Sequence, residues 1–204
     1  MLQKRVLSLL ISQELLNTRA DLESIAESLH SKRPSIAKSC GTLKKLGLVS
    51  LDKNGQIRAT EKGRSHITVV FTGGTYDIIH PGHIHTLKSS KGLGDVLAVS
   101  IARDETVLKN KGHYPTNNER ERAKMIGAIR YVDAALLGSE GDIFEILKRV
   151  RPQVITLGYD QKHDEANIDK ELKRRGLRSR IVRLDSPVPD IKSSSLLKSG
   201  AIVD

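Results

Sequence analysis

Short apolar runs alternate with segments of helical period from residue 67 onward, and this alternation leaves few folds open. The runs lie at 67–71, 96–101, 132–137, 154–157 and 180–184, and the helical segments begin near His83 and lie near 118–129, 142–150, 164–175 and 193–199. Strands separated by helices of this length predict a parallel sheet with helices on both faces. We therefore expect an α/β domain over residues 65–204, a doubly wound, five-stranded parallel sheet with its ligands beyond the carboxyl ends of the strands.

The first 64 residues have a different pattern. Apolar residues recur at helical spacing in three short segments, at 6–11, 22–29 and 36–46, and an Asn54-Gly55 turn between alternating apolar residues predicts a β-hairpin. Three helices and a hairpin predict a winged helix over residues 1–64. The segment resembles the winged helix-turn-helix domains of prokaryotic regulators, including Leu-Lys-Lys-Leu-Gly-Leu-Val at 43–49 and Ala-Thr-Glu-Lys-Gly-Arg at 59–64.

The positive charge of the chain is concentrated in this first part. Residues 1–66 hold 12 Lys or Arg against 6 Asp or Glu, and residues 31–46 hold five basic side chains and no carboxylate. In winged helices the third helix enters the major groove of DNA, so DNA is an expected partner. The predicted contacts are Arg33, Ser35, Lys38, Ser39, Lys44 and Lys45. A solvated charged surface, or a winged helix used for dimerisation or packing, is the alternative.

Composition excludes several classes of protein. With 38% apolar residues in 204, the chain can form a core, and its single cysteine cannot form an internal disulfide. The apolar runs are far shorter than the about 20 residues that cross a bilayer, and the N-terminus has the pattern of an amphipathic helix. We expect no membrane partner, a cytoplasmic location and a homodimer.

The segment 72–83 contains the residues most typical of a binding site. Glycines follow the first strand of the sheet, and two histidines flank Pro81-Gly82 at the start of a helix. Small residues let a ligand approach the backbone, and the N-terminus of a helix attracts phosphate. No Ser-His-Asp or Cys-His arrangement is suggested. We expect the histidines to donate hydrogen bonds to a phosphate as charge builds up on it.

The string Gly-Thr-Tyr-Asp-Ile-Ile-His-Pro-Gly-His at 74–83 resembles the signature of the HxGH nucleotidyltransferases, a cytidylyltransferase-like superfamily with a Rossmann-like fold. The resemblance covers about residues 67–200. It implies an enzyme that joins the α-phosphate of a nucleoside triphosphate to a phosphorylated acceptor and releases pyrophosphate. Mg²⁺ is expected to accompany the triphosphate.

The resemblance also implies roles for individual residues. His80 and His83 would be the catalytic pair, and Lys109, Lys111 and Arg122 would contact the acceptor or triphosphate. The implied nucleotide-binding residues are Thr75, Tyr76, His80, Pro81, Gly82, His83, Asp160, Ser193, Ser194 and Ser195. The chain departs from cytidylyltransferases at 186–190, where they usually carry an arginine; Arg183 is the nearest substitute. As alternatives, Asp160 is a turn residue and Arg122 forms an ion pair on a helix surface.

A third histidine, His85, makes a zinc site worth weighing, but no spaced cysteine or acidic partner accompanies it. We expect His85 on a helix surface and no metal held by the protein itself.

The identity of the acceptor is less strongly indicated. Segments 101–107 and 156–161 resemble archaeal FAD synthases, whereas Ile-Arg-Tyr-Val-Asp at 129–133 looks equally like glycerol-3-phosphate cytidylyltransferases. A winged helix is also fused to some archaeal riboflavin kinases. The favoured reaction is ATP and FMN to FAD, and the alternative is CTP with an alcohol phosphate. A DNA-binding regulator with a nucleotide-sensing domain is the competing hypothesis from another class.

Overall fold

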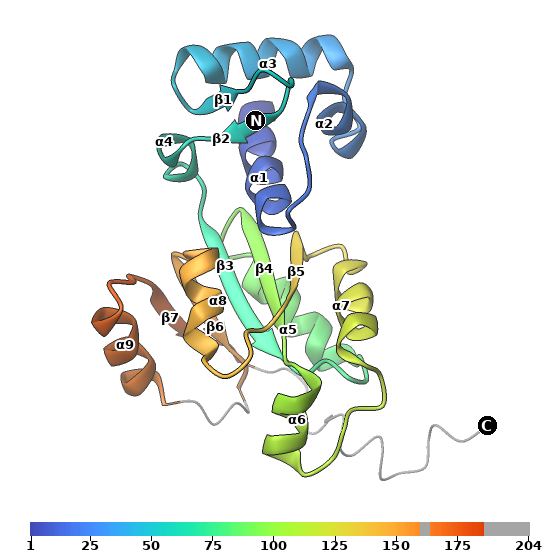
Figure 1. The fold of residues 1–204 in the computed structure, drawn as a ribbon, viewed down its shortest axis with the longest axis vertical. Coiled ribbons are helices and arrows are strands. Elements are labelled where there is room, and N and C mark those ends of the chain that lie inside the picture. The colour runs from blue at the N-terminus through green and yellow to red at the C-terminus, as the bar shows by residue number, and fades with distance from the viewer. Residues whose placement is uncertain (160–163, 186–204) are drawn as a thin grey trace, which may run out of the picture. The chain divides into compact units, whose positions relative to one another are not determined.

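The computed structural model describes residues 1–159 and 164–185. The chain divides into two compact units, Met1–Thr68 and a second unit that begins at Val69. Figure 1 shows both ribbons, and each unit is described separately below. Within the described ranges, no helix has the length and apolar character needed to cross a membrane.

The first unit contains helices and one hairpin. Its elements are α1 (Leu2–Leu15), α2 (Leu22–Ser28), α3 (Arg33–Lys45), β1 (Val49–Leu51), β2 (Ile57–Ala59) and α4 (Glu61–Arg64). The carboxylate of Asp21 caps α2 by accepting hydrogen bonds from two backbone N–H groups. β1 and β2 pair antiparallel around a turn in which Gly55 has a φ of +77°. The elements lie where the sequence predicts them, and the winged-helix interpretation itself stays a prediction.

The burial of α3 corrects one predicted contact. The helix buries Ile36, Ser39, Cys40 and Leu43, which share one side at helical spacing. Ser39 is only 9% exposed, so it faces the core and is not available to DNA. Burial also raises the pKa of the Cys40 thiol. The solvent-facing side of α3 therefore carries the other five predicted contacts, which are Arg33, Ser35, Lys38, Lys44 and Lys45.

The second unit is built on a parallel sheet of five strands. They are β3 (Val69–Gly74), β4 (Val96–Ile101), β5 (Ala134–Leu137), β6 (Val154–Leu157) and β7 (Arg180–Arg183). The strand order is β5-β4-β3-β6-β7, and every neighbouring pair is parallel. From central β3 the chain fills one side of the sheet and then crosses to the other. The α/β prediction is confirmed, and the point where the order reverses lies beside the end of β3.

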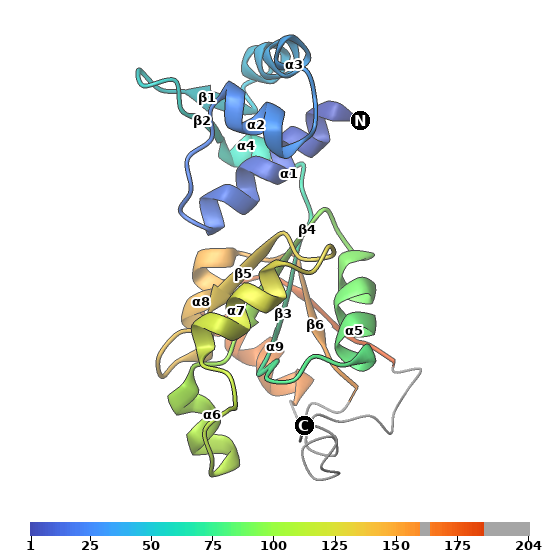
Figure 2. The same cartoon turned by 90° about the vertical axis from the view of Figure 1, so that its right-hand side faces the viewer.

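Helices cover both faces of this sheet. α5 (Pro81–Lys91) and α7 (Glu119–Gly127) cover one face, where Leu87 and Ile126 join a buried cluster with residues of β3, β4 and β6. Figure 2 shows how the chain leaves β3 and enters α5. α8 (Ile143–Val150) and α9 (Glu165–Arg174) lie on the opposite face. Burying each such aliphatic side chain stabilises the fold by about 1.5–3 kcal/mol.

Candidate active site

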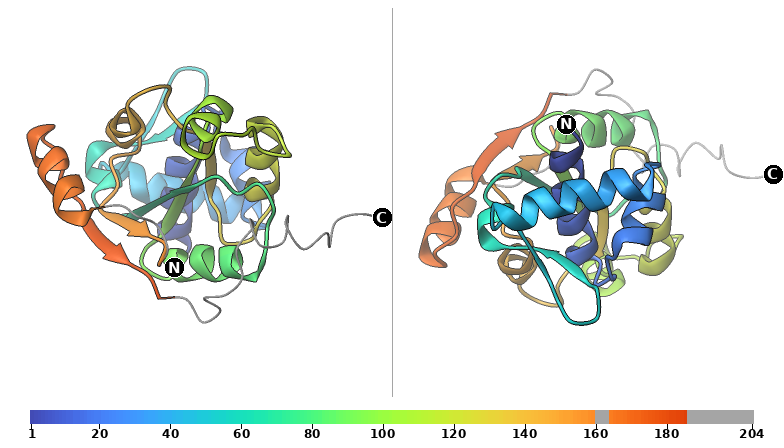
Figure 3. Two further views of the ribbon diagram at one scale, coloured as in Figure 1. Left: turned by 90° about the horizontal axis from the view of Figure 1, so that it is seen from below. Right: turned by 90° about the horizontal axis from the view of Figure 1, so that it is seen from above.

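The site begins in the turn that follows β3, at the edge formed by the carboxyl ends of the strands, which faces the viewer in the left panel of Figure 3. Tyr76 in this turn has a φ of +52°, in the left-handed region. A Cβ atom on Gly74 would lie 2.8 Å from Cε2 of the Tyr76 ring. Glycine at 74 is therefore required for the ring to pack over the end of the strand.

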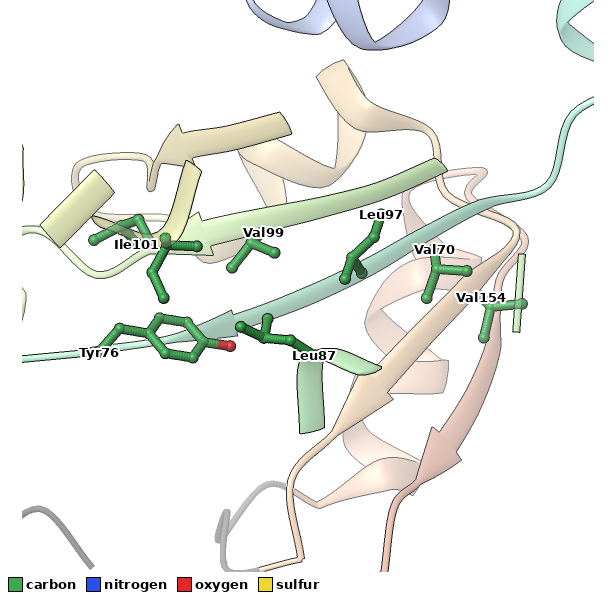
Figure 4. Close-up of a cluster of buried hydrophobic side chains, with 8 residues drawn as sticks. Val70, Tyr76, Leu87, Leu97, Val99, Ile101 and Val154 are labelled. Carbon is green, nitrogen blue, oxygen red and sulfur yellow. The ribbon is translucent and has the colours of Figure 1, made fainter. Parts of the chain in front are cut away.

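Tyr76 contributes its backbone to the turn and its ring to the core. The side chain is 4% exposed and lies among Leu87, Val99 and Ile101, as Figure 4 shows. This burial raises the pKa of the phenol far above its usual value. The predicted use of the Tyr76 backbone toward a phosphate is compatible with this packing, because the ring fixes the path of the main chain.

The two histidines lie together at the start of α5. His80 is the N-cap residue, its side chain makes no capping hydrogen bond, and Pro81 occupies the first turn. The rings of His80 and His83 stack with centroids 3.9 Å apart, and the His83 ring lies 5.1 Å from that of Tyr76. The Nδ1 atoms of both imidazoles are buried.

This arrangement suits an anion. The first N–H groups of a helix have no partner within the helix, and its positive dipole end lies at the same place. Two imidazoles side by side add hydrogen-bond donors at that end. His85, two residues after His83, instead contacts the hydroxyl of Ser89 through Nε2 at 3.3 Å. Within the described ranges, no three His, Cys, Asp or Glu side chains are placed to hold a metal ion.

Asp77 connects the turn to a second loop, a contact that sequence reasoning missed. Its buried carboxylate accepts hydrogen bonds from the backbone N–H groups of Thr116 and Asn117, both at 2.8 Å. The Asn117 side-chain amide donates in return to the Asp77 carbonyl at 3.0 Å. The loop between α6 (Asp104–Lys111) and α7 is thereby held against the histidine turn. The one feature of the sequence that could have pointed to this contact is the position of Asp77 within the motif at 74–83.

Arg122, from α7, is fully buried beneath the same turn. Its guanidinium donates to the carbonyl oxygens of Thr75 at 2.5 Å, Ala102 at 2.8 Å and Asn117 at 2.9 Å. It also pairs with the Asp104 carboxylate at 2.6 Å. The alternative of an ion pair on a helix surface is wrong, because the ion pair is present but the side chain is enclosed. Contact between Arg122 and a substrate stays a prediction, since the guanidinium would have to leave these partners.

The predicted acceptor lysines lie on the same edge of the sheet. Lys109 and Lys111 are exposed in the last turn of α6, which follows the carboxyl end of β4. The chain then turns at Gly112, with a φ of +76°, into the loop that Asp77 holds. Lys111 thus lies five residues before Thr116, which Asp77 holds against the histidine turn. Asp160 and Ser193–Ser195 lie outside the described residues.

A hollow of about 550 Å³ opens between the start of α6 and the start of α7. Its lining includes four carboxylates, those of Asp104, Glu105, Glu119 and Glu140, and the two arginines Arg103 and Arg120. Arg103 is already paired with Glu119 at 3.0 Å. Because this lining carries more negative than positive charge, we do not place the phosphates of a substrate there.

Comparison with known proteins assigns the second unit to a family. Residues 71–199 match the family model described as "Cytidylyltransferase-like", and this range includes the whole turn from Thr72 to His83. The chain is a member of the cytidylyltransferase-like family. The match begins after the first unit ends at Thr68, so membership concerns the sheet and its site.

Several curated relatives within this family are named FAD synthase. The chain is 46% identical to that of Thermoplasma acidophilum over 129 residues, which covers 63% of this chain and 90% of the relative. It is 43% identical to that of Methanosarcina barkeri over 137 residues, covering 67% and 94%. A solved structure, described as the lipopolysaccharide core biosynthesis protein from Thermoplasma volcanium, has a TM-score of 0.57 at 44% identity. It covers 59% of this chain and 98% of its own.

Proposed function

We propose that this chain transfers the AMP part of ATP to FMN, forming FAD and pyrophosphate. The observation that carries the proposal is the stacked pair His80 and His83 at the start of α5, in a family member 42–47% identical to the curated FAD synthases in the comparison. The two imidazoles offer hydrogen-bond donors to an anion, and we infer the substrates, ATP and FMN, from the name of the relatives.

In the proposed reaction one bond forms and one breaks. An oxygen of the FMN phosphate attacks the α-phosphorus of ATP, and the bond from that phosphorus to the oxygen bridging to the β-phosphate breaks. Pyrophosphate leaves with the bonding electron pair, so no oxidant or covalent enzyme intermediate is needed. Such a reaction depends on positioning and charge stabilisation, for which these side chains are suited.

Each group of residues has a proposed task. His80 and His83 donate hydrogen bonds to the phosphate oxygens on which negative charge increases in the transition state. The backbone of Thr75 and Tyr76, with Pro81 and Gly82 at the helix start, lines the triphosphate. Lys109 and Lys111 hold the phosphate of FMN. Arg122 and Asp77 act as positioning residues, because their described contacts are to the loops rather than to solvent.

The remaining assignments concern the nucleotide. Asp160 would contact the nucleoside, and the hydroxyl groups of Ser193, Ser194 and Ser195 would hold the β- and γ-phosphates, as the family resemblance implies. Mg²⁺ enters as part of the substrate, bound to the triphosphate, because this ion keeps much of its coordination to phosphates and water. A cytoplasmic location and a homodimer remain predictions of the sequence.

A substrate panel tests the proposal. Pyrophosphate release is measured with ATP or CTP against FMN, glycerol 3-phosphate and pantetheine phosphate. We expect release with ATP and FMN. Turnover with CTP and glycerol 3-phosphate instead would replace the acceptor by an alcohol phosphate. Nucleotide binding without release in any combination would favour the nucleotide-sensing regulator.

The histidine pair has a matched control on its own helix. Replacing His83 or His80 by Ala should lower kcat by about 10² or more, because a donor to developing charge is lost. His85→Ala removes a third imidazole of α5, whose ring contacts Ser89, and should leave kcat within a few fold. Equal losses in all three variants would mean that the pair has no special role.

We also propose that the first unit binds duplex DNA through α3. The exposed side of this helix carries Lys38, Lys44 and Lys45, and no carboxylate occurs anywhere in α3. A Cβ atom on Gly41 would meet nothing within 4 Å, so the helix is open to close approach there. The right panel of Figure 3 shows α3 lying across its unit beside the hairpin. Positive charge and small exposed residues suit a helix that approaches phosphates in a groove.

The described contacts refine the predicted DNA-binding set. Ser35 is exposed at the start of the helix, whereas the Arg33 guanidinium pairs with Glu23 at 3.2 Å and would have to exchange that partner for a phosphate. Lys38→Gln combined with Lys45→Gln should reduce the slope of log K against log salt by about 2, because each lysine that no longer neutralises a phosphate lowers it by about one unit. Lys170→Gln, an exposed lysine of α9, is the control. Salt-independent binding by the wild type would exclude the proposal.

A further inference from the structure

The aromatic side chains of this chain are few, which makes their positions informative. It has two Phe, four Tyr and no Trp. Phe71 and Tyr76 are buried, while Tyr114 is 56% exposed and is the only aromatic side chain in the described ranges that is mainly open to solvent. A ligand with a large flat ring binds best against an aromatic face. Tyr114 is therefore the first candidate for such a contact.

The other partly exposed rings are less suitable. The ring of Phe144 is covered by the Arg175 guanidinium, whose central carbon lies 4.7 Å from the ring centroid. Tyr131 packs against the core cluster and precedes β5, so it lies toward the amino ends of the strands, away from the histidines. Tyr159 follows β6 at the edge formed by the carboxyl ends of the strands, so it is a second candidate for the contact with a flat ring, and it can be tested.

The chain places Tyr114 close to the proposed phosphate site. It lies two residues before Thr116, whose N–H donates to the Asp77 carboxylate at 2.8 Å. Asp77 in turn precedes His80 by three residues. Each residue spans at most about 3.6 Å, so these short connections keep Tyr114 on the edge of the sheet that carries His80 and the exposed Lys111.

The ring is also held in place. Its hydroxyl donates a hydrogen bond to Oε1 of Glu105 at 2.9 Å, which joins the loop that carries Tyr114 to helix α6. This bond to a carboxylate raises the pKa of the Tyr114 phenol, so the phenol stays protonated and bonded at neutral pH. A ring restrained before binding loses less freedom when a ligand stacks on it.

We propose that Tyr114 stacks against the isoalloxazine ring of FMN while Lys109 and Lys111 hold its phosphate. This inference rests on the proposed function and makes Tyr114 the residue that distinguishes a flavin from an alcohol phosphate. Glycerol 3-phosphate has the phosphate but no ring, so it gains nothing from Tyr114. The two acceptor classes are separated by this contact.

Steady-state kinetics of the full-length chain with ATP and FMN test the inference. Tyr114→Leu should raise the KM for FMN about tenfold, as expected when one aromatic stack is removed, with kcat within about threefold and the KM for ATP unchanged. Tyr114→Phe keeps the ring and should keep the KM for FMN within about threefold. A loss of folding would change kcat and both KM values together.

Flavin fluorescence supplies a readout independent of turnover. Tyrosine stacked on FMN quenches its fluorescence by electron transfer from the phenol, which neither phenylalanine nor leucine supplies. The wild type should therefore quench the fluorescence, and both Tyr114→Phe and Tyr114→Leu should quench it less. FAD formation by the wild type with an unchanged KM for FMN in Tyr114→Leu would overturn this inference alone. A KM for FMN that is raised in Tyr159→Leu but not in Tyr114→Leu would also overturn the inference about Tyr114 alone. No FAD formation and no FMN binding by the wild type would overturn the proposed function as well.

Discussion

Gly74 is held at its position by the neighbouring ring rather than by its own backbone angles. A Cβ atom there would lie 2.8 Å from Cε2 and 3.0 Å from Cζ of Tyr76, a ring that the core prevents from moving. We expect Gly74→Ala to lower the free energy of unfolding by about 1–3 kcal/mol, as overpacking does, and to reduce kcat by displacing the turn. Urea denaturation gives the first value.

The control for this prediction is Gly127→Ala, at the end of α7 in the same unit. The nearest atom to an added Cβ is 3.6 Å away, and alanine favours the helix. Its free energy of unfolding should be unchanged or up to about 1 kcal/mol higher. Equal stability losses in the two variants would contradict the role given to the Tyr76 ring.

Arg122 provides a second prediction at the scale of a single residue. Arg122→Lys should lower the free energy of unfolding by about 3 kcal/mol or more, because one ammonium group cannot replace the donors to three carbonyl oxygens and leaves Asp104 without its partner. Arg120→Lys, at an exposed position of the same helix, should change it by less than about 0.5 kcal/mol. A stable Arg122→Lys protein with normal affinity for ATP would show that these contacts are dispensable.

Some residues of the site could be predicted from the sequence and others could not. The motif marks His80 and His83 because their spacing across Pro-Gly puts both rings at one helix start. The loop residues that bond to the Asp77 carboxylate lie 39 and 40 residues away along the chain. The partners of Arg122 lie 5, 18, 20 and 47 residues away, and no local pattern reveals this combination. Tyr114 also has no motif around it. Its exposure and its hydrogen bond to Glu105 become visible only in three dimensions.

At the scale of elements, the alternating pattern predicted the strands well because each has several adjacent apolar residues. β4 is buried at all six positions, whereas α6 has one buried residue, Val107, and was not predicted as a helix. A short polar helix leaves almost no hydrophobic period. The connection from α6 to the histidine turn could not be predicted for the same reason, because it depends on hydrogen bonds rather than on apolar residues.

Helix α8 gives a pH-dependent prediction. Asp142 caps it by accepting from the Phe144 N–H and pairs with Arg175 at 2.7 Å; first the backbone hydrogen bond and then the guanidinium lower the pKa of its carboxyl. A group whose pKa is lowered on folding stabilises the protein above its unfolded pKa. That contribution is lost as the pH falls through the folded pKa.

Asp142→Asn should therefore be less stable than the wild type at pH 7, since asparagine can cap the helix but cannot pair with Arg175. The difference in unfolding free energy between the two proteins should shrink between about pH 5 and pH 2, as the wild-type carboxyl is protonated. Urea denaturation at several pH values measures it. A constant difference over this range would contradict the described contacts.

At the scale of the whole molecule, the chain combines two units of which the family match covers only the second. The match with the relative from Methanosarcina barkeri covers 94% of that relative and 67% of this chain, so the relative has little length for a first unit. We expect a chain that begins at Ser65 to keep kcat/KM for ATP and FMN within about threefold. It should lose any affinity for DNA. Loss of turnover on truncation would show that residues 1–64 contribute to catalysis.

The central claim is that the imidazole pair at the start of α5 holds a triphosphate while its α-phosphorus is transferred to FMN. The most direct measurement uses ATP labelled at the α-phosphorus together with FMN, followed by separation of the nucleotides. The label should enter FAD with one pyrophosphate released for each FAD formed, and His80→Ala with His83→Ala should abolish this transfer. Label that stays in ATP, or transfer unaffected by the removal of both imidazoles, would contradict the account.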